Sequence, residues 1–205
     1  MNKYTSNQKG LSFIEAMIVI SVSTILMVAI TSTVANFYRY NAFTIEQTLA
    51  VNAARKGIEE AVGDIREAAY SEEGGYPIVS AATSTFSFYS DVNTDNNVEF
   101  IRLFLDPVTL EFKKGVTSAG GTPLTYVGQP ELIFILGENV KNIEDNTNIF
   151  TYYRSDGTQV TNLTANLLDI SFVQTTIITN VNPNRAPNDF TLTSSATIRN
   201  LKSNL

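Results

Sequence analysis

The sequence predicts an α+β protein in which one long N-terminal helix packs on an antiparallel β-sheet head. Three observations predict it: an uncharged apolar run near the N-terminus, an amphipathic helical stripe after it, and short β-rich segments separated by turn residues beyond. The 205 residues are 43% hydrophobic and 17% charged, which is a globular composition. We expect 1–10 to be a leader, 11–38 a membrane helix, 39–70 its amphipathic continuation and 71–205 the head.

The composition removes several function classes. The chain has no cysteine and no histidine, which excludes disulfide scaffolds, thiolate zinc sites, cysteine nucleophiles and imidazole bases. No sequence spacing singles out a pair of catalytic carboxylates, so we expect no enzymatic activity. Residues 71–205 hold 8 basic and 14 acidic side chains. A surface that binds the phosphates of a nucleic acid needs an excess of basic side chains, so we expect the head to bind no nucleic acid.

The apolar run has the length of a membrane span. Residues Ala16–Ala35 carry no charge, and as a helix they cover about 30 Å, the thickness of a bilayer core. The rest of the chain is too small to bury such a helix, which favours a membrane helix over a core helix. Lys3 and Lys9 precede the run, so we expect a cytoplasmic N-terminus, and the aromatic residues from Phe37 stand where an interfacial belt is expected. Cleavage near Ala35, as in a secretory protein, stays an alternative.

A lone carboxylate, Glu15, stands at the start of this otherwise apolar helix. Burying an unpaired carboxylate costs several kcal/mol, so Glu15 needs a partner or solvation by lipid headgroups. If the chain were cut after Gly10, the new amine of Leu11 would lie four residues before Glu15. That amine, on the same or a neighbouring subunit, is a natural counter-charge.

The segment from Gly10 through Leu11, Ser12, Phe13, Ile14, Glu15, Ala16 and Met17 resembles the class III signal of type IV pilins and type II secretion pseudopilins. The family usually has phenylalanine where this chain has Leu11, and both are apolar. The resemblance implies that a prepilin peptidase cuts between Gly10 and Leu11 and methylates Leu11. It also implies that Glu15 takes part in subunit recruitment and helix registry.

The helical pattern continues beyond the membrane segment. Apolar residues recur at spacings of three and four, forming one stripe. The stripe consists of Val51, Ala54, Ile58, Val62, Ile65 and Ala69. Gly57 and Gly63 each weaken the helix by about 1 kcal/mol relative to alanine, which predicts some flexibility there. The helix is expected to stop near Tyr70 because Gly74, Gly75 and Pro77 cannot continue it.

From Ile78 onward the pattern predicts strands joined by turns. Turn residues interrupt the apolar runs at Asp95–Asn97, Gly120–Gly121, Gly128–Pro130 and Asp156–Gly157. Asn180–Asp189, with two prolines, is expected to be an exposed loop. The predicted strands are Thr85–Ser90, Val98–Leu105, Thr109–Lys113, Leu132–Leu136, Ile149–Arg154, Leu167–Thr179 and Phe190–Asn200.

One of these turns carries alternating oxygen ligands. Asp91, Asn93, Asp95 and Asn97 stand at every second position, as in a calcium loop. The sixth position lacks the required glycine and the twelfth, Arg102, lacks the glutamate. A hairpin turn in which Asp and Asn bond the local backbone is therefore favoured, with calcium as the weaker alternative and no other cofactor expected.

The chain as a whole is similar to the J-type minor pseudopilins and related minor pilins. The resemblance is carried by Asn36–Arg39, Asp64–Ala68, Phe86–Asp91, Ile101–Asp106, Phe150–Tyr153 and Thr197–Asn200. It implies a subunit near the tip of a filament that helps to start assembly. The implied partners are the prepilin peptidase, other minor and major pilins or pseudopilins, the inner-membrane assembly platform and, before assembly, membrane lipid.

The resulting hypothesis is a minor pilin or pseudopilin, held in the cytoplasmic membrane by one helix and then built into an extracytoplasmic filament. A membrane-tethered binding head that never polymerises, such as an adhesin or sensor, is the main alternative, and it would need no cut at Gly10. A secreted enzyme would instead require a cut near Ala35.

Overall fold

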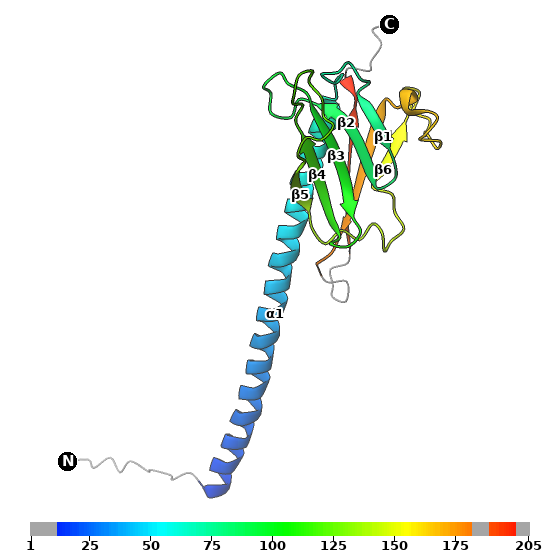
Figure 1. The fold of residues 1–205 in the computed structure, drawn as a ribbon. Coiled ribbons are helices and arrows are strands. Elements are labelled where there is room, and N and C mark those ends of the chain that lie inside the picture. The colour runs from blue at the N-terminus through cyan, green and yellow to red at the C-terminus, as the bar shows by residue number, and fades with distance from the viewer. Residues whose placement is uncertain (1–11, 182–188, 200–205) are drawn as a thin grey trace, which may run out of the picture. The chain divides into compact units, whose positions relative to one another are not determined.

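A computed structural model describes residues 12–181 and 189–199. Within this part the chain forms one long helix, two antiparallel sheets and a short 3-10 helix (Figure 1). The elements are α1 (Phe13–Arg66), β1 (Ile78–Ala81), β2 (Thr85–Ser90), β3 (Glu99–Asp106), β4 (Glu111–Thr117), β5 (Leu132–Gly137), β6 (Phe150–Tyr153), η1 (Leu167–Asp169), β7 (Phe172–Thr179) and β8 (Phe190–Thr197). The predicted α+β class is confirmed.

The chain divides into two units at a point inside α1. The first unit ends at Ile45 and the second begins at Glu46. The described part of the first unit is helical throughout, apart from Ser12. The second unit holds the last turns of α1 and all of the strands.

The second unit is built on two antiparallel sheets. Strands β1 to β5 form a meander in chain order, and β6, β7 and β8 form a smaller sheet in the same way. Burial alternates along β3 between buried and half-buried residues, from buried Glu99 to half-buried Asp106, as expected for a strand with one face on the core. The last turns of α1 pack on the sheets through an apolar stripe that includes Ala54, Ile58, Val62 and Ile65.

Aromatic side chains dominate the core of the second unit. Phe86 and Phe88 of β2 stack with ring centroids 5.1 Å apart, and Phe86 also contacts Phe150 and Tyr152 of the second sheet. All four side chains are almost completely buried. The Tyr152 hydroxyl donates to the Ala82 carbonyl at 2.8 Å, so the one polar atom of this cluster is satisfied.

Several features of the fold differ from the predictions, and one of them is β4, which runs from Glu111 to Thr117 rather than from Thr109 to Lys113. The helix ends at Arg66 rather than near Tyr70 because Ala68 forms a bridge with Ser90 of β2. The amide of Ala69 then donates to the Tyr89 carbonyl at 2.9 Å, which takes the chain out of the helix. Strand β1 was not predicted, and the start of the predicted strand Leu167–Thr179 is the 3-10 helix η1. Part of the predicted loop Asn180–Asp189 lies outside the described residues.

Candidate functional site

The N-terminal end of α1 is the first part of the candidate site. The predicted cleavage and methylation positions, Gly10 and Leu11, lie outside the described residues. The first turn closes with a bond of 3.1 Å from the Ala16 amide to the Ser12 carbonyl. Glu15 lies exposed in this turn, where the unpaired amides of a helix start favour a negative charge. It forms no ion pair with any other described residue.

The helical segment that contains Glu15 has exposed apolar side chains on all of its sides. Large hydrophobic side chains are exposed along this segment, from Phe13 at 82% to Val34 at 47%. Within the described residues, α1 is the one helix that is long and apolar enough to cross a membrane. Water is a poor solvent for such a surface, so this segment requires lipid or other apolar helices around it.

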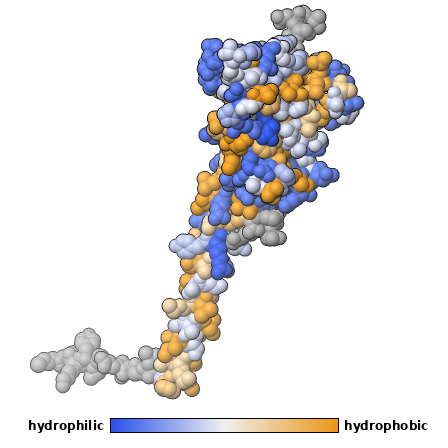
Figure 2. Space-filling view, viewed as in Figure 1, coloured by the Kyte–Doolittle hydropathy of each residue, from blue (hydrophilic) through white to orange (hydrophobic). Residues whose placement is uncertain are grey.

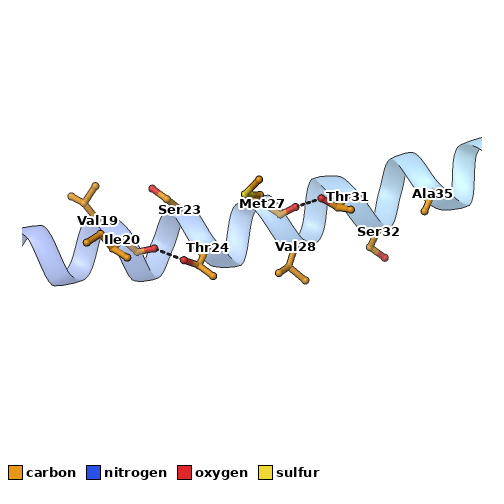
Figure 3. Close-up of a pocket in the computed structure, with 9 residues that line it drawn as sticks. All are labelled: Val19, Ile20, Ser23, Thr24, Met27, Val28, Thr31, Ser32 and Ala35. Carbon is orange, nitrogen blue, oxygen red and sulfur yellow. Dashed lines mark hydrogen bonds between the residues drawn. The ribbon is translucent and has the colours of Figure 1, made fainter.

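Several hydroxyl groups of this segment donate hydrogen bonds within the helix. Ser21 donates to the Met17 carbonyl and Thr24 to the Ile20 carbonyl, both at 2.8 Å. Thr31 bonds Met27 in the same way, and Figure 3 shows this bond together with that of Thr24. A hydroxyl without a partner would cost free energy in lipid, so these bonds make the segment compatible with a membrane.

One face of the segment forms a shallow apolar groove. Its lining residues recur at intervals of four along a single helix (Figure 3). They are Val19, Ile20, Ser23, Thr24, Met27, Val28, Thr31, Ser32 and Ala35. Rows at this interval are the ridges and grooves through which helices pack on one another, and small side chains let helix backbones approach closely.

The loop between β2 and β3 contains the four calcium candidates. Asp91 accepts from the Asn96 amide, Asn93 from the Asp95 amide and Asp95 from the Asn97 amide, at 2.8 to 3.0 Å. Thr94 and Asn96 have positive φ, as tight turns require. One side-chain oxygen each of Asp91, Asn93 and Asp95 thus serves the turn.

A buried carboxylate supports this loop. Glu99, which is 2% exposed, accepts from the Val92 amide and from the Asn93 side chain at 3.2 Å each. Burial raises the pKa of the Glu99 carboxyl above its usual value. The Oδ1 atom of Asp91 is buried without a hydrogen-bond partner among the described residues. No group of three or more acidic residues suited to a metal ion occurs in the described ranges, and calcium binding stays a prediction.

Two neighbouring lysines of the head, Lys113 and Lys114, form ion pairs. Lys113 binds Asp106 and Glu111, each at 2.8 Å. Lys114 is 6% exposed and reaches back to α1, where it binds Asp64 at 3.0 Å and Glu60 at shorter range. The pair therefore fixes strand β4 to its surroundings instead of presenting free charge.

Two features of the second unit escaped the sequence analysis. A side chain at Gly57 would place its Cβ 2.8 Å from the Cβ of Leu136, so glycine is required for the close contact of α1 with β5. Residues Leu132–Ile135 of β5 are all exposed, although each is apolar. The sequence did contain a signal for the exposed strand: polar and apolar residues do not alternate in residues 132–135. Such an apolar run is typical of a strand that is covered on both faces.

Comparison with known proteins identifies the N-terminal region. Residues 5–31 match the model of a family described as the prokaryotic N-terminal methylation motif. No curated protein and no solved structure matches the chain. The matched residues run from the predicted leader through Glu15 into the exposed apolar segment, so the chain carries the N-terminal motif of a type IV pilin-like prepilin.

Proposed function

We propose that the chain is a minor pilin or pseudopilin subunit of a type IV pilus or a type II secretion pseudopilus. One observation carries the proposal: the methylation motif at residues 5–31 leads directly into a helix whose apolar surface is exposed on all sides. A role as a membrane anchor would account for the exposed apolar helix. The methylation motif supports the further step of processing by a prepilin peptidase.

The proposed mechanism begins with processing. The peptidase cuts between Gly10 and Leu11 and methylates the new amine of Leu11. The helix then leaves the lipid and packs among the helices of neighbouring subunits through faces such as the groove of Figure 3. Glu15 pairs with the Leu11 amine of a neighbouring subunit, which sets the register and removes an otherwise unpaired charge.

The resemblance to J-type minor pseudopilins supports a more specific role. In this proposal the subunit lies near the filament tip, contacts other minor and major subunits and helps to start assembly on the inner-membrane platform. Its head lies outside the cytoplasm and acts by binding proteins rather than by catalysis. A non-polymerising tethered head would have the same anchor but no cut at Gly10.

The first prediction concerns the N-terminus of the mature protein. We expect intact-mass and N-terminal peptide analysis of protein from its native membrane to show a chain that begins with N-methylated Leu11. A chain that keeps Met1 would contradict the proposal and favour the tethered head. A chain that begins after Ala35 would indicate a secreted protein.

The second prediction concerns Glu15. We expect Glu15→Ala to reduce incorporation into filaments by about tenfold or more, since the neighbouring amine would lose its counter-charge in a low-dielectric core. Sheared filaments and membranes are compared by quantitative immunoblotting. Glu59→Ala, which removes an exposed carboxylate in the second unit, serves as the control. Equal incorporation of both variants would remove the assigned role of Glu15.

A further inference from the structure

Strand β5 forms an open edge of the larger sheet. It is the last strand in the sheet order and pairs on one side with β4. Its residues Leu132, Ile133, Phe134 and Ile135 are 61%, 46%, 48% and 54% exposed. Figure 2 shows apolar residues at this position, beside the last turns of α1 in the second unit. The strand thus offers unpaired backbone groups together with apolar side chains on both of its faces.

This edge lacks the usual protection against pairing. Natural edge strands carry inward-pointing charges, lysine or proline, or are covered by another element. Residues 132–135 contain no charge and no proline. The strand is also rigidly held, because it pairs with β4 and its Leu136 packs against Gly57. An apolar edge of this kind, kept in a defined position, is suited to adding a strand from another chain.

An acidic groove adjoins the edge. Its apolar part is formed by Leu49, Ala50 and Ala53 of α1 with Ile135 and Leu136 of β5, and the groove as a whole has a volume of about 450 Å³.

Carboxylates flank this groove and the strand. Glu46 and Glu138 line the groove, are exposed, and form no ion pair within the described ranges. Glu131 stands at the opposite end of the strand and binds Arg102 at 2.7 Å. The unpaired negative charge is therefore concentrated at the Glu138 end of β5.

We propose that the β5 edge binds an extended apolar segment of a different filament subunit, which adds to the sheet as a strand and carries a lysine or arginine next to its apolar residues. The basic side chain would meet Glu46 and Glu138. A second copy of this chain fits less well. The same segment of a second copy, residues 131–138, contains no lysine or arginine, so it would not bring its own basic side chain to Glu46 and Glu138. The inference rests on the proposed function, because it assumes neighbouring subunits.

The test is site-specific photo-cross-linking of the full chain in its native membrane. A photoreactive phenylalanine analogue replaces Ile133 in one variant and Val108 in a matched control, since Val108 is 87% exposed in the β3–β4 turn. We expect about tenfold more protein adduct from position 133. Peptide mapping should place the adduct in a strand-forming segment of another pilin-like subunit, next to a lysine or arginine.

A charge reversal tests the acidic groove. We expect Glu46→Lys combined with Glu138→Lys to reduce the adduct from position 133 by about tenfold, whereas Glu73→Lys, a reversal at another exposed position, should leave it unchanged. Equal adducts from positions 133 and 108, adducts with lipid alone, or adducts with a second copy of this chain would overturn the inference. The N-terminus of the same samples is determined in parallel. A methylated Leu11 with any of these contrary results would leave the proposed function standing and reject only the β5 interface.

Discussion

Replacing Gly57 by alanine is expected to destabilise the second unit by about 2 kcal/mol. The added Cβ would overlap the carbonyl group of Leu136 and lie 2.8 Å from its Cβ. These atoms belong to the backbone and inner part of a paired strand, so they cannot swing aside as the end of a flexible side chain can. Overpacking of this kind costs about 1–3 kcal/mol or more, which exceeds the gain of about 1 kcal/mol from replacing a helical glycine.

Gly63 offers a matched control in the same helix. A Cβ at this position would have no neighbour within 4 Å, so Gly63→Ala is expected to stabilise the protein by about 1 kcal/mol. Both variants are compared by denaturant unfolding of the full chain in detergent, followed by tyrosine fluorescence. Opposite shifts of the two midpoints are expected. Equal stabilisation by both substitutions would mean that α1 does not approach β5 so closely.

The pair of glycines also shows where the sequence analysis reached its limit. Both residues lie in the helix beside the apolar stripe, and helix propensity alone predicts the same local weakening at each. In the structure the two glycines differ, because only Gly57 lies against Leu136, a residue far away in the chain. Local propensity contains no information on such an approach.

Local patterns were sufficient for most strands. β2 matches its predicted range, and β3 shows the alternation of burial that the run from Val98 to Leu105 implies. β1 was missed because its four residues are too few for a periodic pattern and follow Pro77. Its pairing with β2, which includes an irregularity between Ile78 and Ser80, stabilises the strand from outside its own sequence.

The residues of the candidate site likewise differ in whether the sequence alone could identify them. Glu15 and the apolar helix were identifiable because their chemistry depends on near neighbours in the sequence. The β5 edge was not, because a strand becomes an edge only when the order of the whole sheet is known. For Lys114 the sequence showed a basic pair, whereas the structure shows a lysine that joins α1 to β4.

The second large effect is expected for this lysine. Lys114 and Asp64 are both mostly shielded from solvent, with side-chain exposures of 8% and 12%. Removing one partner of a buried ion pair leaves a charge without compensation and costs about 3–5 kcal/mol. We therefore expect Lys114→Met, which keeps the apolar stem, to destabilise the protein by about that amount at pH 7. Denaturant unfolding of the full chain in detergent measures the change.

The pH dependence of this loss tests its electrostatic origin. Burial raises the pKa of Asp64 above its usual value, and the charge of Lys114 opposes this effect. Without Lys114 the pKa of Asp64 should rise further. A carboxyl whose pKa is higher in the folded than in the unfolded state favours folding most at low pH, and this contribution is lost as the pH rises through the folded pKa. The penalty of Lys114→Met should therefore be smallest near pH 4, where Asp64 can take up a proton, and should grow toward pH 7.

A double variant separates charge from packing. In Lys114→Met with Asp64→Leu, neither a buried cation nor a buried carboxylate remains, so most of the lost stability should return and the added pH dependence should disappear. A penalty that is the same at pH 4 and pH 7, or a double variant no more stable than the single one, would show that Lys114 contributes through packing alone. Recovery would instead mean that α1 and β4 are joined by matched charges, since Glu60 and Asp64 are the carboxylates that meet this lysine. The contact between α1 and β4 would then lose stability when only one partner of the buried ion pair is replaced, and would keep most of its stability when both partners are replaced together.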